Sequence, residues 1–318
     1  MSQRHDFRAH RVTYAVPDSK EGDYIQHSSI KLHTSPSGML LQQMKQVEFL
    51  ILGAGWTSNF LVPQLEVANI PYAATTTTGR DRTIPFKFDP ESGDAEPYKR
   101  LPAAATVLIT FPLVGHNQSK ALVGLYRSVH GAKNNWIQLG STGIFNQLPS
   151  EWSTSDSHYD KHDKRAIAED ELLSLHGSVL NLSGLYGGER VPAGWLSRIV
   201  KSKEDIKKRG AVHFVHGDDV ARAIIGTHRN FTPGKRWIVS DLRVYDWWDL
   251  IMSFSAATSS STAEEQQLRQ QCTEWVTELM AEENIRALPR DTSTLGRKLD
   301  STGFWQHHAI WPQHKRLA

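Results

Sequence analysis

Two closely spaced glycines follow the short apolar run "FLIL" at residues 49–52. Gly53 and Gly55 stand in "FLILGAGWTSNFL", between a predicted buried strand and a predicted helix. Here the first glycine permits a tight turn, and the second lets the backbone approach a pyrophosphate bound at the helix N-terminus. Ser58 occupies the place of a usual third glycine, where a small side chain fits. The pattern predicts a dinucleotide site, although it is also compatible with a plain strand-to-helix turn.

Hydroxyl and guanidinium side chains follow the next predicted strand. The run "TTTTGRDR" places Arg80 and Arg82 directly after four threonines. Both kinds of group suit a 2′-phosphate, so the run favours NADP over NAD. Asp81 keeps NAD open, because an acidic residue in this region binds the ribose hydroxyls of NAD. The arginines could also belong to a solvated loop.

Strand-sized apolar runs alternate with amphipathic helical stretches over most of the chain. The runs "VEFLIL", "TVLITF" and "NWIQLGS" are apolar on both faces, which is typical of parallel strands covered by helices on both sides. The sequence therefore predicts a doubly wound α/β sheet, the Rossmann fold. We expect residues 1–45 to form a flexible extension and 46–250 the NAD(P)-binding domain, with 186–210 contributing to a smaller substrate lobe. Residues 251–318 would form the C-terminal helical part of that lobe.

Several polar and glycine residues mark helix ends. Ser261, with Glu264 three residues later, predicts a capping box before a long C-terminal helix. Asp218 or Asp219 is expected to cap the helix through "VARAIIGTH". Gly177 is expected to end the helix through "KRAIAEDELLSLHG".

Composition excludes several classes of function. The 318 residues carry a formal net charge of only +2, without the concentrated basic face that nucleic-acid binding needs. The apolar runs are too short to span a bilayer. Cys272 is the single cysteine, which excludes an internal disulfide and fits a reducing, cytoplasmic compartment. The Arg-rich N-terminus leaves a mitochondrial location open. We expect a small-molecule substrate as partner, and a homodimer remains open.

Histidines near residue 215 raise the question of a metal. His213 and His216 lie three residues apart in a predicted strand. Alternate strand residues point to opposite faces, which separates these two side chains. No metal site is therefore predicted.

The order of motifs resembles that of an atypical or extended short-chain dehydrogenase/reductase, in the NAD(P)-dependent epimerase/dehydratase group. The similar segments span about residues 47–250 and include "LILGAGW", "LGSTGIFN", "LNLSGLYGGER", "VHFVHGDDVARAI" and "WIVSD". The resemblance implies an oxidoreductase or epimerase acting on a small carbonyl or alcohol. It assigns the pyrophosphate to Gly53, Gly55, Trp56 and Thr57, the adenosine ribose to Thr77, Thr78 and Arg80, and the adenine or nicotinamide side to Phe111 and Pro112.

The catalytic residues that the resemblance implies are only partly present. The family uses a Ser or Thr to orient the substrate oxygen, a Tyr to move the proton, and a Lys four residues after that Tyr. Ser141 matches the first, although it could simply cap the following turn. Counting back from Glu169 puts Arg165 in the place of the Lys and Lys161 in the place of the Tyr. Tyr159 lies two residues upstream of that place.

Two interpretations follow from this altered motif. In the first, Lys161 moves the proton, because the nearby positive charge of Arg165 would favour its neutral amine. Tyr159, His158 or His162 are the alternatives to Lys161 in that role, since Arg165 itself cannot act as an acid. In the second, the acid–base function is lost and the chain is a non-catalytic NADP-dependent binding or regulatory protein. In either case the candidates that border a substrate pocket are Tyr186, Arg190 and Trp195. Arg190 could clamp a phosphate or carboxylate, or could be an ordinary surface arginine.

Overall fold

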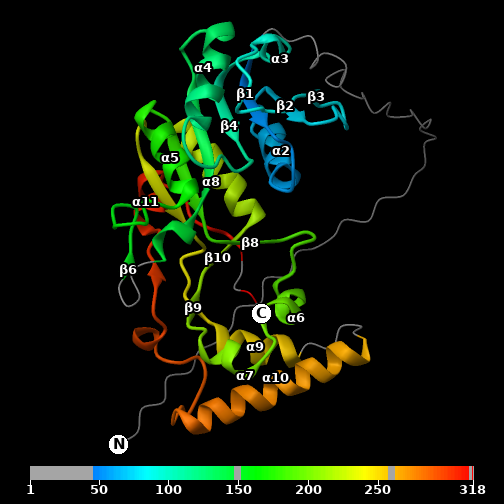
Figure 1. Cartoon of the computed structure of the whole chain (residues 1–318), viewed down its shortest axis with the longest axis vertical. Coiled ribbons are helices and arrows are strands. Elements are labelled where there is room, and N and C mark those ends of the chain that lie inside the picture. Colours follow the sequence, from blue (N-terminus) through cyan, green and yellow to red (C-terminus); the bar gives the residue numbers. More distant parts are fainter. Residues whose placement is uncertain (1–45, 147–151, 257–261, 315–316, 318) are drawn as a thin grey trace, which may run out of the picture. The chain divides into compact units, whose positions relative to one another are not determined.

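The computed structural model describes residues 46–146, 152–256, 262–314 and 317. Its centre is a seven-stranded sheet in the order β11-β7-β5-β4-β1-β2-β3, in which each neighbouring pair is parallel (Figure 1). This confirms the predicted doubly wound sheet. The strands are β1 (Gln46–Leu52), β2 (Tyr72–Thr76), β3 (Ile84–Pro85), β4 (Ala103–Ile109), β5 (Asn135–Ser141), β7 (Ser178–Leu182) and β11 (Arg236–Val239).

The direction of the chain through the sheet reverses beside β1. The chain runs outward from β1 to β2 and β3, and then returns to place β4 on the other side of β1. In open α/β sheets such a switch point leaves a crevice at the carboxyl ends of the strands, where ligands bind. The glycine loop follows β1 at this point, so the topology places it in the crevice.

Helices cover both faces of the sheet. One face is buried under α2 and α8, and its core includes Leu61, Leu65, Val220 and Ile224. The other face is buried under α4 and α5, which lie together in Figure 1. These helices and the short α3 are α2 (Ser58–Val67), α3 (Glu96–Lys99), α4 (Gln118–His130), α5 (Lys164–Ser174) and α8 (Gly217–Arg229).

A smaller group of helices has a core of its own. Leu196, Ile206, Trp248 and Val276 belong to one buried cluster that joins these helices. The helices are α6 (Leu196–Ile199), α7 (Lys203–Lys207), α9 (Trp247–Ala256) and α10 (Ala263–Glu282), and short strands lie beside them, namely β8 (Gly184–Tyr186), β9 (Ala211–Val212), β10 (Phe214–His216) and β12 (Tyr245–Asp246).

The C-terminal segment divides between the two cores. Helix α10 belongs to the smaller group, whereas α11 (Thr302–His307) buries Phe304 and Trp305 against the main sheet beside Trp237. Between them β13 (Lys298–Leu299) pairs with β6 (Trp152–Ser153). Helix α11 therefore packs beside the sheet rather than with the smaller group of helices.

Three predicted helix ends are shifted. Thr262 and Glu265 form the capping box of α10, while Ser261 lies outside the described residues. The ring of His216, rather than an aspartate, accepts the capping hydrogen bond of α8, because the strand β10 runs directly into the helix. After α5 the left-handed residue is His176, with φ 64°, one position before the expected glycine.

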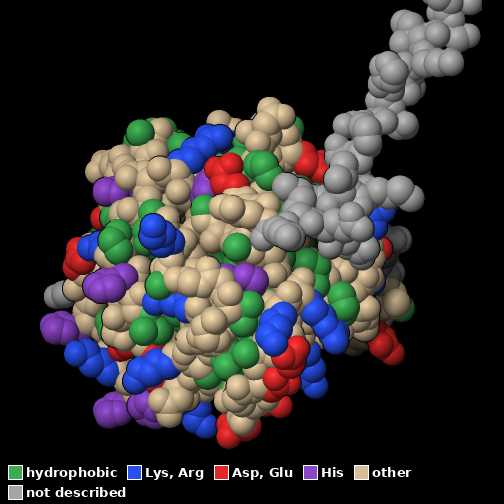
Figure 2. Space-filling model, turned by 90° about the horizontal axis from the view of Figure 1, so that it is seen from above, with side chains coloured by type: hydrophobic (Ala, Val, Ile, Leu, Met, Phe, Trp, Pro, Cys, Tyr) green, Lys and Arg blue, Asp and Glu red, His purple; other side chains and the backbone are tan. Residues whose placement is uncertain are grey.

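The surface shown in Figure 2 has Lys and Arg side chains interspersed with Asp and Glu. This arrangement agrees with the small net charge of the chain, +2. Among the described residues, no helix has the length and apolar character needed to cross a bilayer.

Candidate functional site

The loop after β1 is fixed by β2 and β4. The backbone N–H of Gly53 donates to Thr75 Oγ1 at 2.9 Å, and that of Ala54 donates to the Thr75 carbonyl at 2.6 Å. Gly53 has φ +95°, and a Cβ there would lie 2.7 Å from Thr110 Oγ1. Both facts require glycine. The geometry of the turn therefore explains why residue 53 is a glycine.

Gly55 has a different explanation. It is exposed, and a Cβ built on it would meet no described atom within 4 Å. The fold alone does not require glycine here. A bare backbone that faces open space at the start of a helix is what the close approach of a pyrophosphate needs. The residues present therefore fit a dinucleotide.

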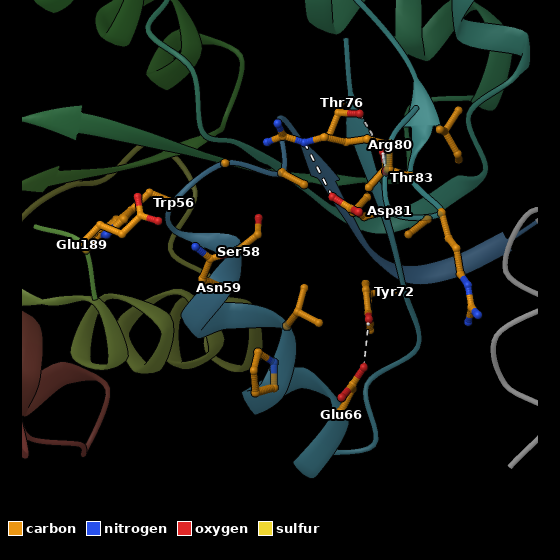
Figure 3. A pocket seen from close by; sticks show the side chains of 18 residues that line it. Trp56, Ser58, Asn59, Glu66, Tyr72, Thr76, Arg80, Asp81, Thr83 and Glu189 are labelled. Atoms are coloured by element: carbon orange, nitrogen blue, oxygen red, sulfur yellow. Dashed lines mark hydrogen bonds and ion pairs between the residues drawn. The ribbon is translucent and has the colours of Figure 1, made fainter. Parts of the chain in front are cut away.

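A groove of about 890 Å³ extends from this loop between α2 and the segment that links β2 to β3 (Figure 3). Ser58 and Asn59 at the start of α2 line one side, and Thr76 and Thr83 line the other. Ser58 is buried, and its hydroxyl has no hydrogen-bond partner among the described residues. The groove thus offers polar groups along its length and leads toward the end of β2.

Charged residues gather where the groove reaches the β2–β3 segment. Arg80, Asp81 and Arg82 all line it, and the Arg80 guanidinium lies 3.7 Å from the Asp81 carboxylate. Thr77 and Thr78 are exposed and are not among the lining residues. The structure thus brings Arg80 to the groove, whereas Thr76 takes the place expected of Thr77 and Thr78.

A second cavity of about 290 Å³ lies on the other side of the glycine loop. Gly55, Trp56 and Thr57 form one wall. The opposite wall includes Ser141 at the end of β5 and Arg165 in the first turn of α5. Because Gly55 and Trp56 also line the groove, the two spaces meet at the glycine loop. An extended ligand could therefore occupy both.

Ser141 caps a turn and also lines the second cavity. Its Oγ accepts a hydrogen bond from the Gly143 N–H at 3.1 Å and so caps the 3₁₀ turn η1 (Thr142–Phe145). That bond uses a lone pair of the hydroxyl and leaves its hydrogen to donate elsewhere. The side chain is half-buried and lines the second cavity. Capping and orientation of a ligand oxygen are therefore compatible.

A buried polar network holds the backbone of Ser141. Its N–H donates to Glu169 Oε1 at 3.3 Å, and its carbonyl accepts from Asn181 at 3.1 Å. Glu169 is fully buried and is paired with Arg236. The end of β5 is thus fixed from α5, β7 and β11.

Arg165 reaches the cavity from α5. One terminal nitrogen donates to the Leu139 carbonyl at 3.3 Å. Its Nε is buried and has no hydrogen-bond partner among the described residues. A buried N–H without a partner is costly unless a ligand or water accepts from it. Arg165 therefore has donor capacity to spare at the cavity.

Tyr159 is held away from this cavity. Tyr159 precedes helix α5, which starts at Lys164. The Tyr159 hydroxyl donates to Asp170 at 2.7 Å, and the Tyr159 ring packs against Phe145. Burial, with the hydrogen bond to Asp170, raises the pKa of Tyr159. A proton-transferring tyrosine needs the opposite shift. Neither Tyr159 nor the exposed Lys161 is among the residues that line the cavity.

Of the remaining predicted site residues, two line the second cavity and three do not. Pro112 and Arg190 line the second cavity. Phe111 stacks on Phe88, with ring centroids 6.2 Å apart, and is not among the lining residues. Tyr186 and Trp195 pack in a buried cluster around Phe214 and do not line it either.

Two hydroxyl-bearing residues that line the second cavity were not predicted from the sequence. Thr110 follows β4, and Ser183 follows β7. Both stand one residue beyond the carboxyl end of a parallel strand, where side chains meet in an α/β sheet. The rule finds them only once the strand ends are known, because the predicted strand "TVLITF" extends past Thr110.

His213 has a structural role. Its Nδ1 lies 2.8 Å from the Arg243 carbonyl, and its Nε2 accepts from the Leu299 N–H at 3.0 Å. Burial lowers the pKa of His213 to about 4. Both ring nitrogens are used, so His213 does not form a metal pair with His216.

Comparisons with known proteins place the fold. No family model matches the chain, and no curated protein matches it. Among solved structures, a Methylobacillus flagellatus protein described as an NAD-dependent epimerase/dehydratase is 16% identical, with 82% of this chain and 91% of that chain covered and a TM-score of 0.52. A dTDP-glucose 4,6-dehydratase from Bacillus anthracis, in complex with NAD, is 11% identical, with coverages of 84% and 92% and a TM-score of 0.53. The yeast methylglyoxal/isovaleraldehyde reductase, complexed with NADPH, is 12% identical, with coverages of 84% and 94% and a TM-score of 0.52.

These likenesses define the class of fold. The chain has the Rossmann fold of NAD(P)-dependent epimerases, dehydratases and reductases. At such low identity the likeness concerns the fold, and the site must be judged from its own residues.

Proposed function

We propose that the chain binds NADP along the groove and the second cavity, and acts as an oxidoreductase or epimerase on a small carbonyl or alcohol. The observation that carries the proposal is the position of Gly55, whose bare backbone lies where the two spaces meet. The adenosine half would lie in the groove and the nicotinamide half in the second cavity. The structural neighbours in complex with NAD and NADPH support a nicotinamide dinucleotide.

The charges at the end of the groove favour NADP. Arg80 and Arg82 line it and could bind a 2′-phosphate, while Asp81 could bind the ribose hydroxyls of NAD. A titration that follows tryptophan fluorescence would compare NADPH with NADH. We expect tighter NADPH binding, lost in Arg80→Ala and kept in Lys87→Ala, an exposed neighbour outside the groove. Equal affinities for the two nucleotides would contradict the assignment of NADP.

Ser141 and Arg165 are the residues that we propose for the reaction. NADPH, when bound, would supply a hydride to the substrate carbonyl. The Ser141 hydroxyl would donate a hydrogen bond to the substrate oxygen, and the Arg165 guanidinium would stabilise the negative charge that develops there. Because Tyr159 and Lys161 lie outside the cavity lining, the proton would reach that oxygen from water through the Ser141 or Ser183 hydroxyl.

Activity is tested by the loss of NADPH absorbance with a panel of aldehydes, ketones and nucleotide sugars. We expect Ser141→Ala to lower kcat at least about tenfold with little change in NADPH affinity, since one hydrogen bond to a developing oxyanion contributes a few kcal/mol. Ser128→Ala is the control, because that hydroxyl bonds within its own helix turn. Turnover that is unchanged in Ser141→Ala would contradict the assigned role.

A non-catalytic NADP-dependent regulator is the second candidate. It is favoured by one observation: the described lining of the second cavity contains no Tyr, Lys or His side chain. In that case NADPH would bind tightly and no substrate of the panel would be turned over. Retained NADPH affinity in Ser141→Ala, together with no turnover by the unchanged chain, would select this candidate.

A further inference from the structure

The rings of His314 and His216 are stacked, with centroids 3.4 Å apart and an angle of 16° between their planes. His216 is the last residue of β10, whereas His314 lies far later in the sequence, in the C-terminal segment after α11. We infer that His314 is a positioning residue for the loop after β1, and that it acts through His216. The inference rests on the proposed function, which assigns a dinucleotide to that loop.

The His216 ring is enclosed by the start of α8 and by other aromatic rings. Its Nδ1 accepts the Asp218 N–H at 3.1 Å and so caps α8. Phe60 and Tyr186 meet the ring edge-on, with centroids 5.4 and 4.9 Å away, and the His216 side chain is only 13% exposed. His314 covers one face of the ring. Without His314 that face would lose its packing contacts, and His216 would be held less firmly.

His216 is connected to the loop through Gly187. A Cβ built on Gly187 would clash with the His216 ring, so the ring packs directly against this glycine. The Gly187 carbonyl in turn accepts the indole N–H of Trp56 at 3.1 Å. Trp56 belongs to the loop and lines both the groove and the second cavity. The position of the His216 ring therefore bears on the position of the indole.

Phe60 connects the same two residues by a second path. Its ring is edge-on to His216 and also to Trp56, where the centroids are 4.8 Å apart. Phe60 lies in the first turn of α2, directly after the loop. Rings packed edge to face have a preferred geometry, so the position of one restricts the next. Both paths lead from His216 to the residues that follow Gly55.

The backbone at His314 is held independently of its ring. Asp219 is fully buried and accepts the backbone N–H groups of Gln313 and His314, at 2.8 and 3.1 Å. Hydrogen bonds to a carboxylate are among the stronger ones in proteins. The Arg243 guanidinium donates to the His314 carbonyl at 3.5 Å. A substitution of His314 should therefore change the ring and leave the segment in place.

The test compares NADPH binding by three variants of the full chain, measured by calorimetry. His314→Ala removes the ring, and His314→Phe replaces it with another flat ring. His307→Ala is the matched control, because His307 is exposed, packs on Trp237 and lines neither the groove nor the second cavity. We expect affinity about three- to tenfold weaker in His314→Ala, the modest effect usual for coupling through packed side chains. The other two variants should bind NADPH nearly as tightly as the unchanged chain.

A second readout does not depend on NADPH. The backbone N–H groups of Ser58, Asn59 and Phe60 donate to carbonyls of the loop. Amide hydrogen exchange without nucleotide, followed by mass spectrometry, should be faster for the peptide that contains them in His314→Ala. It should be unchanged in His307→Ala and nearly unchanged in His314→Phe. A peptide from α4 serves as the internal reference and should exchange alike in all variants.

The two readouts separate this inference from the proposed function. If the unchanged chain binds no NADPH, the proposed function fails, and hydrogen exchange still decides whether His314 positions the loop. The inference is overturned if the loop peptide exchanges equally in His314→Ala and in the unchanged chain, or if His314→Phe exchanges as fast as His314→Ala. Equally faster exchange of the α4 peptide would indicate general destabilisation and would overturn it too. So would equal NADPH affinities of His314→Ala and the unchanged chain.

Discussion

The guanidinium of Arg190 lies over the indole ring of Trp56, with its Cζ 4.3 Å from the ring centroid. Trp56 belongs to the glycine loop, and its indole N–H donates to the Gly187 carbonyl at 3.1 Å. Two segments far apart in the sequence therefore meet in the lining of the second cavity. Under the proposed binding of NADP, Arg190 would lie within reach of the pyrophosphate.

Replacement of Arg190 by alanine should weaken NADPH binding about tenfold, the loss expected for one charge-assisted contact. Stability should change by only about 0.5 to 1 kcal/mol, as for an exposed cation–π pair. The control is Arg198→Ala, because Arg198 lies in a similar way over Trp195, at 5.7 Å, outside both cavities. Fluorescence titration measures the affinities, and equal effects of the two substitutions would count against the role of Arg190.

Gly55→Ala should fold normally and lose NADPH binding. The new Cβ would meet no described protein atom within 4 Å, but it would occupy the space that we assign to the pyrophosphate. We expect an affinity loss of about 10- to 100-fold, equivalent to about 1.4 to 2.8 kcal/mol. Gly124→Ala is the control, since a Cβ there also meets nothing and the site lies in α4. If both variants bind NADPH like the unchanged chain, the proposed cradle is wrong.

Removal of one partner from the buried ion pair behind Ser141 should lower the free energy of unfolding strongly. Arg236 is paired with Glu169 and with Asp170, and both Arg236 and Glu169 are almost fully buried. Arg236→Met would leave a buried carboxylate without its cation, at a cost of about 3 to 5 kcal/mol. Urea unfolding measures this loss. The double substitution Arg236→Met with Glu169→Gln should recover part of it, and a double variant less stable than Arg236→Met would contradict this reasoning.

His213 should make the fold sensitive to acid. Its folded pKa of about 4 lies below the ordinary value of 6.5, so its contribution to stability is complete above pH 6.5 and is lost as the pH falls toward 4. Protonation would break the hydrogen bond that Nε2 accepts from Leu299. A shift of this size corresponds to at most about 3 kcal/mol. Urea unfolding at pH 7 and pH 4.5 should show a larger loss for the unchanged chain than for His213→Gln. Equal losses would show that other groups control the acid sensitivity.

Much of the fold followed from local pattern. The strand expected over "NWIQLGS" is β5, and the alternation of apolar strands with helices gave the parallel sheet. Such patterns reflect burial on both faces of a strand, which the sequence records directly. Helix ends were predicted less accurately. Strand β10 runs directly into α8, so the last residue of that strand, His216, caps the helix in place of an aspartate.

The candidate site was predictable only in part. Gly55, Arg80, Ser141 and Arg165 reach the groove or the second cavity as expected, because each stands near the end of a predicted strand or at the start of a helix. Tyr159 does not, because its hydroxyl donates a hydrogen bond to Asp170, 2.7 Å away. Spacing along the chain gave no sign of that contact.

The sequence by itself determined the parallel sheet and the position of the glycine loop, because periodicity and turn residues act over a few neighbours. Only the tertiary structure decided which side chains converge. It placed His314 beside Asp218, and Arg190 over Trp56. Contacts between segments so distant in the chain depend on how the packed elements close over one another, and no local pattern encodes that geometry.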